Sequence, residues 1–364
     1  STYYFTRQIS WSPGGRFTHD NRKASVLRQT KLGVSEVFGG SPIVIATTSD
    51  FTGEKSFEEF TPRASLSFKP NSDHLLFASY AKGFKGGGFD PRGQSTQAAD
   101  TNGDGIRSEQ EIFDFFLFDP ETVDSYELGW KGSFAGGDVN LALTGFYADY
   151  KNVQIPGSVG CIVNGTPTFC GVTTNAAKAT FKGFEAEGNV RLARDFAGAG
   201  SVLGVNGSLG YIDGSFDKYL VNGVDVSNQR RIQNTPKWTA SASLFATVPM
   251  SSGEITGTTT VSYRSKTNQF ETPSPYLDQS GYALWDASLI WRSEDDRYSI
   301  GIFGKNLLDK EYITSGYQFI STQADGTPIL AANGNVIPTL GTEGVVTAFY
   351  GNPRQVFVTG TVKF

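Results

Sequence analysis

The sequence is poor in the residues from which most catalytic and metal centres are built. Its 364 residues include two histidines, two cysteines and one methionine. No GxSxG or HExxH motif occurs, and His19 and His74 stand far apart along the chain. The sequence therefore offers no residue set for nucleophilic or zinc-dependent hydrolysis, and we do not expect an enzyme.

Long runs of one charge sign and long apolar runs are also missing. The net charge of -5 comes from 31 basic and 36 acidic residues that are scattered along the chain, which argues against a nucleic-acid partner. The longest apolar runs are short, such as "SPIVIA" at 41–46, so no membrane-spanning helix is expected. No signal peptide opens the chain. Because "STYYFTRQIS" reads as the interior of a strand, we expect a processed product or a part of a longer protein.

Glycine and aromatic residues are abundant instead, and the main pattern has a period of two. Glycine accounts for 43 residues, and aromatic residues make up 13% of the chain. In 184–192 and 284–292, apolar or small residues alternate with polar ones, as in strands that have one apolar face. The polar faces carry Glu185, Glu187, Arg191, Asp286 and Arg292, and the apolar face of the second segment carries Trp285 and Trp291.

Such segments predict about thirteen strands. They cover 2–10, 14–30, 60–69, 74–85, 123–134, 138–151, 179–192, 201–215, 237–249, 254–266, 282–293, 298–306 and 355–364. Tight turns such as "WSPG", "PNSD", "FAGG", "MSSG" and "SEDD" alternate with long loops. The predicted loops cover 31–59, 86–122, 152–178, 216–236, 267–281 and 307–354.

This alternation predicts an all-β fold, a transmembrane antiparallel β-barrel of the outer-membrane type, because all turns then lie at one end and all loops at the other. Apolar side chains would face lipid and polar ones the lumen. We expect Trp285, Trp291, Tyr147 and Tyr150 to form interface girdles. A soluble β-sandwich or solenoid also alternates, but its strands are usually about five or six residues long. The odd strand count departs from the even number of bacterial barrels, so we expect the beginning of the barrel to be absent.

Several segments resemble one family. "GIFGKNLLDKEY", 301–312, is similar to the penultimate-strand signature of the TonB-dependent outer-membrane receptors, with Asn306, Leu307, Asp309 and Tyr312 in the usual places. A long loop follows, and then "GNPRQVFVTGTVKF" ends on the aromatic Phe364. The segments 61–89 and 125–154 resemble mid-barrel hairpins of the same receptors.

The resemblance implies a barrel of about 22 strands in the bacterial outer membrane, filled by an N-terminal plug. The whole chain, 1–364, would be the C-terminal part of that barrel, with about thirteen of its strands. The family imports scarce nutrients such as siderophore-bound iron, cobalamin, haem or carbohydrate into the periplasm with energy from TonB, and no cofactor is required. Implied partners are outer-membrane lipid and lipopolysaccharide, the TonB complex through the missing N-terminal part, and the barrel-assembly machinery through Phe364. The alternatives are a passive porin-like channel and a surface binding or structural barrel.

The stretch "DTNGDGIRSEQE", 100–111, has the oxygen-ligand spacing of an EF-hand loop. The glycine- and proline-rich segment before it excludes an entering helix, so we do not expect a calcium sensor. A structural calcium site and a merely polar turn both remain. The calcium ligands would be Asp100, Asn102, Asp104, the carbonyl of Ile106 and Glu111.

Loop aromatic residues and the two cysteines are the remaining candidates. Phe113, Phe115 and Phe116 would either contact a ligand or partner or pack over the barrel mouth. Tyr276, Tyr317 and Phe319 are further candidates for substrate contact, and they fit either a siderophore or a sugar. Cys161 and Cys170 would form a loop-closing disulfide outside the cytoplasm, or would be free thiols or half of a metal site inside it.

Overall fold

The structure is a computed structural model. It describes the backbone of residues 1–33, 39–157, 159–163, 166–221, 223–339 and 344–364, and the side chains of this part except those of 159–163 and 166–170.

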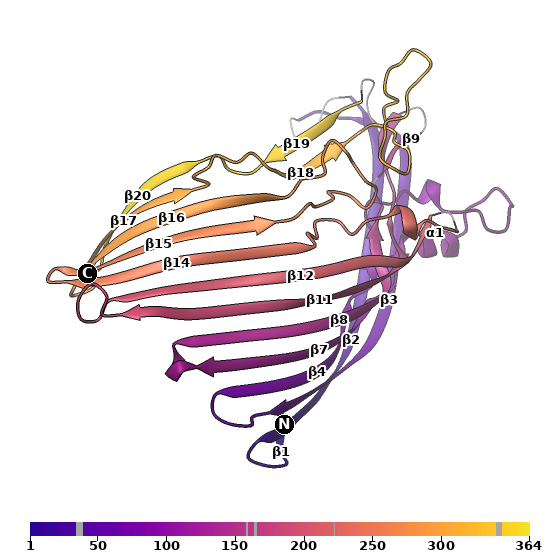
Figure 1. Cartoon of the computed structure of the whole chain (residues 1–364). Helices are drawn as coiled ribbons and strands as arrows, with labels where there is room; N and C mark the ends of the chain where they lie inside the picture. Colours follow the sequence, from indigo (N-terminus) through magenta and orange to yellow (C-terminus); the bar gives the residue numbers. More distant parts are fainter. Residues whose placement is uncertain (34–38, 158, 164–165, 222, 340–343) are drawn as a thin grey trace.

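One large antiparallel sheet forms the molecule (Figure 1). Its strand order is β1-β2-β3-β4-β7-β8-β11-β12-β14-β15-β16-β17-β20, and the short β13 (Val224–Asp225) pairs with β12 beside this path. The first seven strands are β1 (Tyr3–Tyr4), β2 (Ile9–Leu32), β3 (Ile43–Phe68), β4 (His74–Lys85), β7 (Glu121–Phe134), β8 (Val139–Pro156) and β11 (Thr173–Arg194). The others are β12 (Val202–Val221), β14 (Trp238–Met250), β15 (Gly253–Arg264), β16 (Tyr282–Ser293), β17 (Tyr298–Lys305) and β20 (Gln355–Val362).

The short and long connections lie at opposite ends of the sheet, as predicted. Both termini lie at the end of the short turns, and the long loops, with the helix α1 (Glu109–Phe116), gather at the other end (Figure 1). The sheet curves strongly between these ends. This is the strand arrangement of an outer-membrane barrel wall.

Two predicted boundaries near the N-terminus are wrong. "WSPG" is not a turn, because Pro13 stands opposite Ala64 inside β2, and the turn lies at 5–8 instead. β1 covers only Ser10 and Trp11 of β2, so Pro13 lies where a missing N–H is tolerated. The predicted loop 31–59 is also too long, because β3 already begins at Ile43. This part of β3 buries polar and small residues, Thr48, Ser49 and Gly53, beside Phe51 and Phe57, so its burial is not accompanied by a clear apolar–polar alternation in the sequence.

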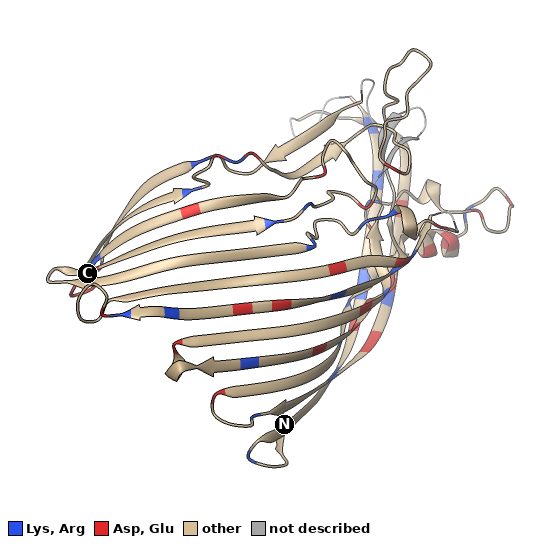
Figure 2. Ribbon diagram, viewed as in Figure 1, with Lys and Arg blue, Asp and Glu red and all other residues tan. Residues whose placement is uncertain are grey.

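The two faces of the sheet differ as the alternation predicted. Register places Trp130 opposite Leu143 on the apolar face, and Leu143 opposite Ala186 of the next strand. The polar face carries Glu187, opposite Ser208, which in turn stands opposite Ser241. Figure 2 shows long stretches of strand without charge, and β14 and β20 contain no charged residue at all. The apolar face is therefore the lipid-facing one.

The aromatic girdle is only partly as predicted. Tyr147 lies on the apolar face, opposite Tyr126, and Trp285 lies on the same face, opposite Val261. The girdle prediction is wrong for Tyr150, because it lies three positions after Tyr147 and an odd spacing reverses the face. Its ring contacts Phe181 edge-on, with 5.3 Å between the ring centroids, on the lumen side.

The long loops contain short strands and the helix α1. The hairpin β9 (Val159–Val163) and β10 (Thr166–Cys170) lies between β8 and β11, and the hairpin β18 (Ile313–Gln318) and β19 (Val346–Tyr350) lies between β17 and β20. The loop after β4 contains the short strands β5 (Gly88–Phe89) and β6 (Leu117–Phe118) beside α1. In the described part of the chain, no helix is long and apolar enough to cross a membrane.

The most buried apolar cluster lies among these loops, not in the lumen. Val26 and Phe51, from the loop ends of β2 and β3, pack against Phe89 and Phe116. The rings of Phe51 and Phe116 are stacked, with 4.5 Å between their centroids. The cluster fixes the loop between β4 and β7 on the β2–β3 hairpin.

Candidate functional site

A cavity opens among the long loops, and we call it the mouth cavity. Its volume is about 1290 Å³. Arg28 of β2 and Arg92, which follows β5, lie next to each other in its wall. The rest is lined by neighbouring residues of these two segments, by Gly157 and Gly171 from the connection between β8 and β11, and by residues from the loops after β15 and β17. The side chains used below are Arg28, Arg92, Phe270, Glu271, Tyr317 and Phe319. The cavity therefore combines aromatic rings with charged groups at the extracellular end of the barrel.

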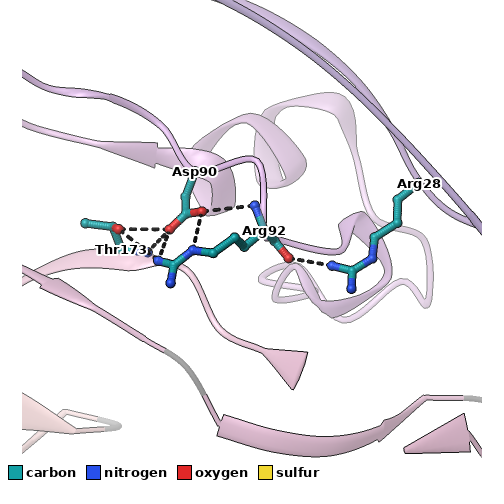
Figure 3. A network of polar contacts seen from close by, with 4 residues as sticks. All are labelled: Arg28, Asp90, Arg92 and Thr173. Carbon is teal, nitrogen blue, oxygen red and sulfur yellow. Dashed lines mark hydrogen bonds and ion pairs between the residues drawn. The ribbon is translucent and has the colours of Figure 1, made fainter. Parts of the chain in front are cut away.

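A buried carboxylate organises one wall of the mouth cavity (Figure 3). Asp90 is 4% exposed, and its Oδ1 accepts hydrogen bonds from the backbone N–H and the Nε of Arg92, at 3.0 and 2.9 Å. Its Oδ2 accepts from Nη2 of Arg92 at 2.5 Å and from both the N–H and the hydroxyl of Thr173 at 2.8 Å. Arg28 donates from Nη1 to the carbonyl of Arg92 at 2.7 Å. One carboxylate thus joins the loop after β5 to β11, and Arg28 adds β2.

These contacts also set the ionisation of Asp90. Burial alone would raise the pKa of the carboxyl group. The hydrogen bonds from Arg92 and Thr173 outweigh burial and lower its pKa to about 2. The pKa of Arg92 is raised, chiefly by its hydrogen bond to Asp90. Both groups are therefore charged at neutral pH.

The predicted loop aromatic residues divide into two groups. Tyr317 and Phe319 line the mouth cavity with their rings stacked, 6.1 Å apart at the centroids. Phe113, Phe115 and Phe116 belong to the apolar cluster on β2 and β3, and Phe116 is fully buried. The packing alternative therefore holds for Phe116, which is closed to a ligand.

Tyr276 lies outside the lining of the mouth cavity and is 54% exposed. Its neighbours Ser274 and Leu277 are fully buried, and the hydroxyl of Ser274 donates to Oε1 of Gln318. The loop after β15 is therefore packed onto β18, beside Tyr317.

The predicted calcium loop is closed by its own hydrogen bonds. Oδ1 and Oδ2 of Asp100 accept from the N–H groups of Gly103 and Gly105 at 2.7 and 2.8 Å. The side chains of Asn102 and Asp104 accept from the N–H groups of Asp104 and Ile106. Among the residues the structure describes, no group of three or more His, Cys, Asp or Glu side chains is arranged to hold a metal. Calcium binding here stays a prediction.

Glu111 also caps a helix, a role that was not predicted from the sequence. It is the third residue of α1, and its side chain accepts from the N–H of Ser108, whose hydroxyl accepts from the N–H of Glu111. Hydrogen bonds from the hydroxyl of Thr101 and from backbone N–H groups lower the pKa of Glu111 to about 2. The pattern Ser-x-x-Glu at 108–111 is a capping box, and it could have predicted the helix.

The family signature forms a hydrogen-bonded turn where β17 leaves the sheet. Asn306 is 4% exposed with a φ of 48°, and its side chain bonds Lys310 twice and donates to the carbonyl of Asn352. The N–H of Leu307 donates to the carbonyl of Trp285, and Oδ1 of Asp309 accepts from the N–H of Arg354.

Tyr312 completes the signature by stacking on Tyr282, with 4.6 Å between the ring centroids. Its ring also covers Gly351, where any side chain would collide with it. The signature thus closes the base of the loop 307–354. Phe364 is fully exposed at the end of the chain.

Other predicted residues lie as follows. Glu185 and Asp286 stand on the polar face, opposite Thr144 and Thr260. Arg191 pairs with Asp138 at 2.6 Å near the short turns. The side chains of Cys161 and Cys170 lie outside the described residues, so the disulfide stays a prediction.

The Asp90 network is not predicted by the sequence. Asp90 and Arg92 stand in "FDPRG", 89–93, where the only local signal is a carboxylate two residues before a guanidinium. The other members of the network, Arg28 and Thr173, are far from Asp90 along the chain. They reach it only because β2 and β11 carry them to the same place in the fold.

Three comparisons bear on the fold. Residues 1–307 match the family described as TonB dependent receptor-like, beta-barrel. The chain is 24% identical over 321 residues to the pesticin receptor of Yersinia pestis, which covers 87% of this chain and 39% of that protein. The chain therefore spans less than half the length of this relative.

Solved structures of similar receptors have the same fold over nearly the whole chain. The ferric yersiniabactin uptake receptor FyuA of Yersinia pestis superimposes with a TM-score of 0.64 at 21% identity, covering 100% of this chain and 44% of that one. The ferric-catecholate import receptor Fiu of E. coli K12, in its closed form, gives a TM-score of 0.59 at 16% identity, covering 100% and 43%. With the family match over most of the chain, these comparisons show that the chain belongs to the TonB-dependent receptors of the bacterial outer membrane and forms part of their β-barrel.

Proposed function

We propose that this chain is the loop-bearing barrel wall of a receptor that imports a ferric siderophore across the outer membrane in a TonB-dependent manner. The observation that carries the proposal is the mouth cavity of about 1290 Å³, lined by aromatic and charged side chains. Small-molecule sites usually measure about 300–1,000 Å³, so this cavity suits a ligand larger than most metabolites.

The printed names of two similar proteins, a ferric yersiniabactin uptake receptor and a ferric-catecholate import receptor, support an iron chelate as the cargo. Aromatic rings such as Tyr317 and Phe319 provide apolar area at low entropic cost, and guanidinium groups bind carboxylate or phenolate oxygens. TonB would act through a segment outside this chain, and Phe364 would serve barrel assembly.

The test is uptake of radioactive iron by cells that express the receptor containing this chain, with a panel of ferric siderophores at nanomolar concentration. We expect accumulation of at least one complex, and loss of that accumulation in a strain without TonB. Uptake that persists without TonB and does not saturate would replace the proposal with the passive-channel alternative. Binding without uptake in either strain would favour a surface binding protein.

A further inference from the structure

Two guanidinium groups lie on the same wall of the mouth cavity and keep donors free. Arg28 uses Nη1 for the carbonyl of Arg92, and Arg92 uses Nε and Nη2 for Asp90. Within the described residues, no carboxylate lies within ion-pair distance of Arg28, and its Nε and Nη2 have no bonded partner there. Nη2 of Arg92 also donates to the hydroxyl oxygen of Thr173 at 3.4 Å, so the free donor of Arg92 within the described residues is Nη1. A guanidinium group with free N–H donors is suited to bind a planar or multidentate anion.

The two arginines differ in how their charge is balanced. The charge of Arg92 is largely neutralised by the buried Asp90, whereas Arg28 has no such partner. The acidic residue on the cavity wall, Glu271, comes from the loop after β15 and also lines a smaller cavity of about 300 Å³. Burial raises the pKa of Tyr219, and the charge of Glu271 raises it further. The wall that holds Arg28 and Arg92 is therefore the cationic side.

We propose that Arg28 and Arg92 form an anion-binding pair in the mouth cavity, that Asp90 is the residue that positions Arg92, and that the imported ferric complex is negatively charged. This inference rests on the proposed function and narrows its substrate class. A neutral ferric complex or a neutral sugar would leave the free donors of the pair without a charged partner.

Asp90 acts through Arg92 and does not contact the ligand. It accepts three hydrogen bonds from Arg92 and two from Thr173, so it fixes both the main chain and the guanidinium plane of Arg92. Arg28 is in turn held by the carbonyl of Arg92. Fixing a guanidinium group before binding lowers the entropic cost of holding an anion.

The experiment measures dissociation constants of two ferric complexes for the purified full-length receptor. One probe is the negatively charged ferric complex of a tricatecholate, and the other is the neutral ferric complex of a trihydroxamate. Variants are Arg28→Gln, Arg92→Gln and Asp90→Asn. Arg231→Gln is the matched control, because Arg231 is an exposed loop residue whose guanidinium bonds only carbonyls of its own loop.

We expect the wild type to prefer the charged complex, with an affinity that falls as salt rises. Arg28→Gln and Arg92→Gln should each weaken binding of the charged complex about tenfold or more, flatten its salt dependence and leave the neutral complex unchanged. Arg231→Gln should behave as the wild type. Asp90→Asn should weaken binding of the charged complex and leave binding of the neutral complex unchanged. The variant that combines Asp90→Asn with Arg92→Gln should bind the charged complex as tightly as the single variant Arg92→Gln.

Equal binding of both complexes, unaffected by the arginine variants, would overturn this inference and leave the proposed function standing. Binding of the neutral complex only would do the same. Equal weakening of both complexes by Asp90→Asn would overturn its positioning role. Failure of the folded wild type to bind any ferric complex would remove the proposed function, and this inference with it.

Discussion

Replacing Asp90 with asparagine should loosen the wall of the mouth cavity by a predictable amount. The carboxyl pKa falls from 3.8 to about 2 in the folded protein. A shift of one unit corresponds to about 1.4 kcal/mol, so the charged form contributes roughly 2 kcal/mol at neutral pH. Because the folded pKa is the lower one, this stabilisation is present above about pH 4 and is lost as the pH falls through about 2.

Hydrogen exchange is the assay, because the network holds two loop segments locally. At pH 7, we expect Asp90→Asn to raise the exchange rate of peptides that contain Gly93 and Thr173 about 30-fold, which is the equivalent of roughly 2 kcal/mol. Asp325→Asn is the control, since that exposed carboxylate bonds only Thr327 in its own turn. A change smaller than about threefold, or an equal change in the control, would refute the reasoning.

Three further predictions follow from other parts of the chain. Leu289→Arg should reduce the magnitude of the free energy of folding into lipid vesicles by about 2–4 kcal/mol, because Leu289 is 52% exposed on the lipid-facing surface. Ser288→Arg, on the polar face, should reduce it far less. Equal losses would contradict the assignment of the two faces. Asn306→Ala should lower the temperature at which the barrel unfolds, measured by the loss of its faster-migrating folded band on gels. The substitution removes three side-chain hydrogen bonds and a residue suited to positive φ. Asn333→Ala, in an exposed loop, should leave this temperature unchanged. Calcium should protect the loop 100–111 from proteolysis with a midpoint of about 0.1–1 mM, and Asp104→Ala should abolish the protection; no protection at any concentration would leave the loop a polar turn.

The membrane-embedded part of the fold could be predicted from the sequence because lipid imposes a strict pattern. A strand between lipid and lumen must alternate, so the faces at Glu187 and Leu289 follow from sequence alone. The rule even shows the error at Tyr150, whose distance from Tyr147 is odd.

Outside the membrane this constraint disappears, and prediction fails with it. The loop end of β3 is a strand that the sequence does not predict, because the residues it buries include Thr48, Ser49 and Gly53 and therefore show no clear apolar–polar alternation. The Asp90 network was missed for a different reason: its strength comes from burial and from Arg28 and Thr173, which are far away along the chain. The capping box of α1 could have been predicted from Ser108 and Glu111. It was not, because the segment that contains them was interpreted as a calcium loop.

The length of β2 and β3 sets how the receptor meets its surroundings. A barrel strand needs about 9–11 residues to cross the hydrocarbon layer, whereas these strands have 24 and 26. The last aromatic residue on the lipid-facing side of β2 is Phe17, opposite Phe60, so about 15 residues continue beyond it. At about 3.3 Å per residue and a tilt near 40°, the hairpin rises roughly 35–40 Å above the hydrocarbon edge. Antibodies raised against whole cells should therefore recognise this hairpin first, and a peptide tag inserted near its tip should be reachable through the sugar layer of the cell surface.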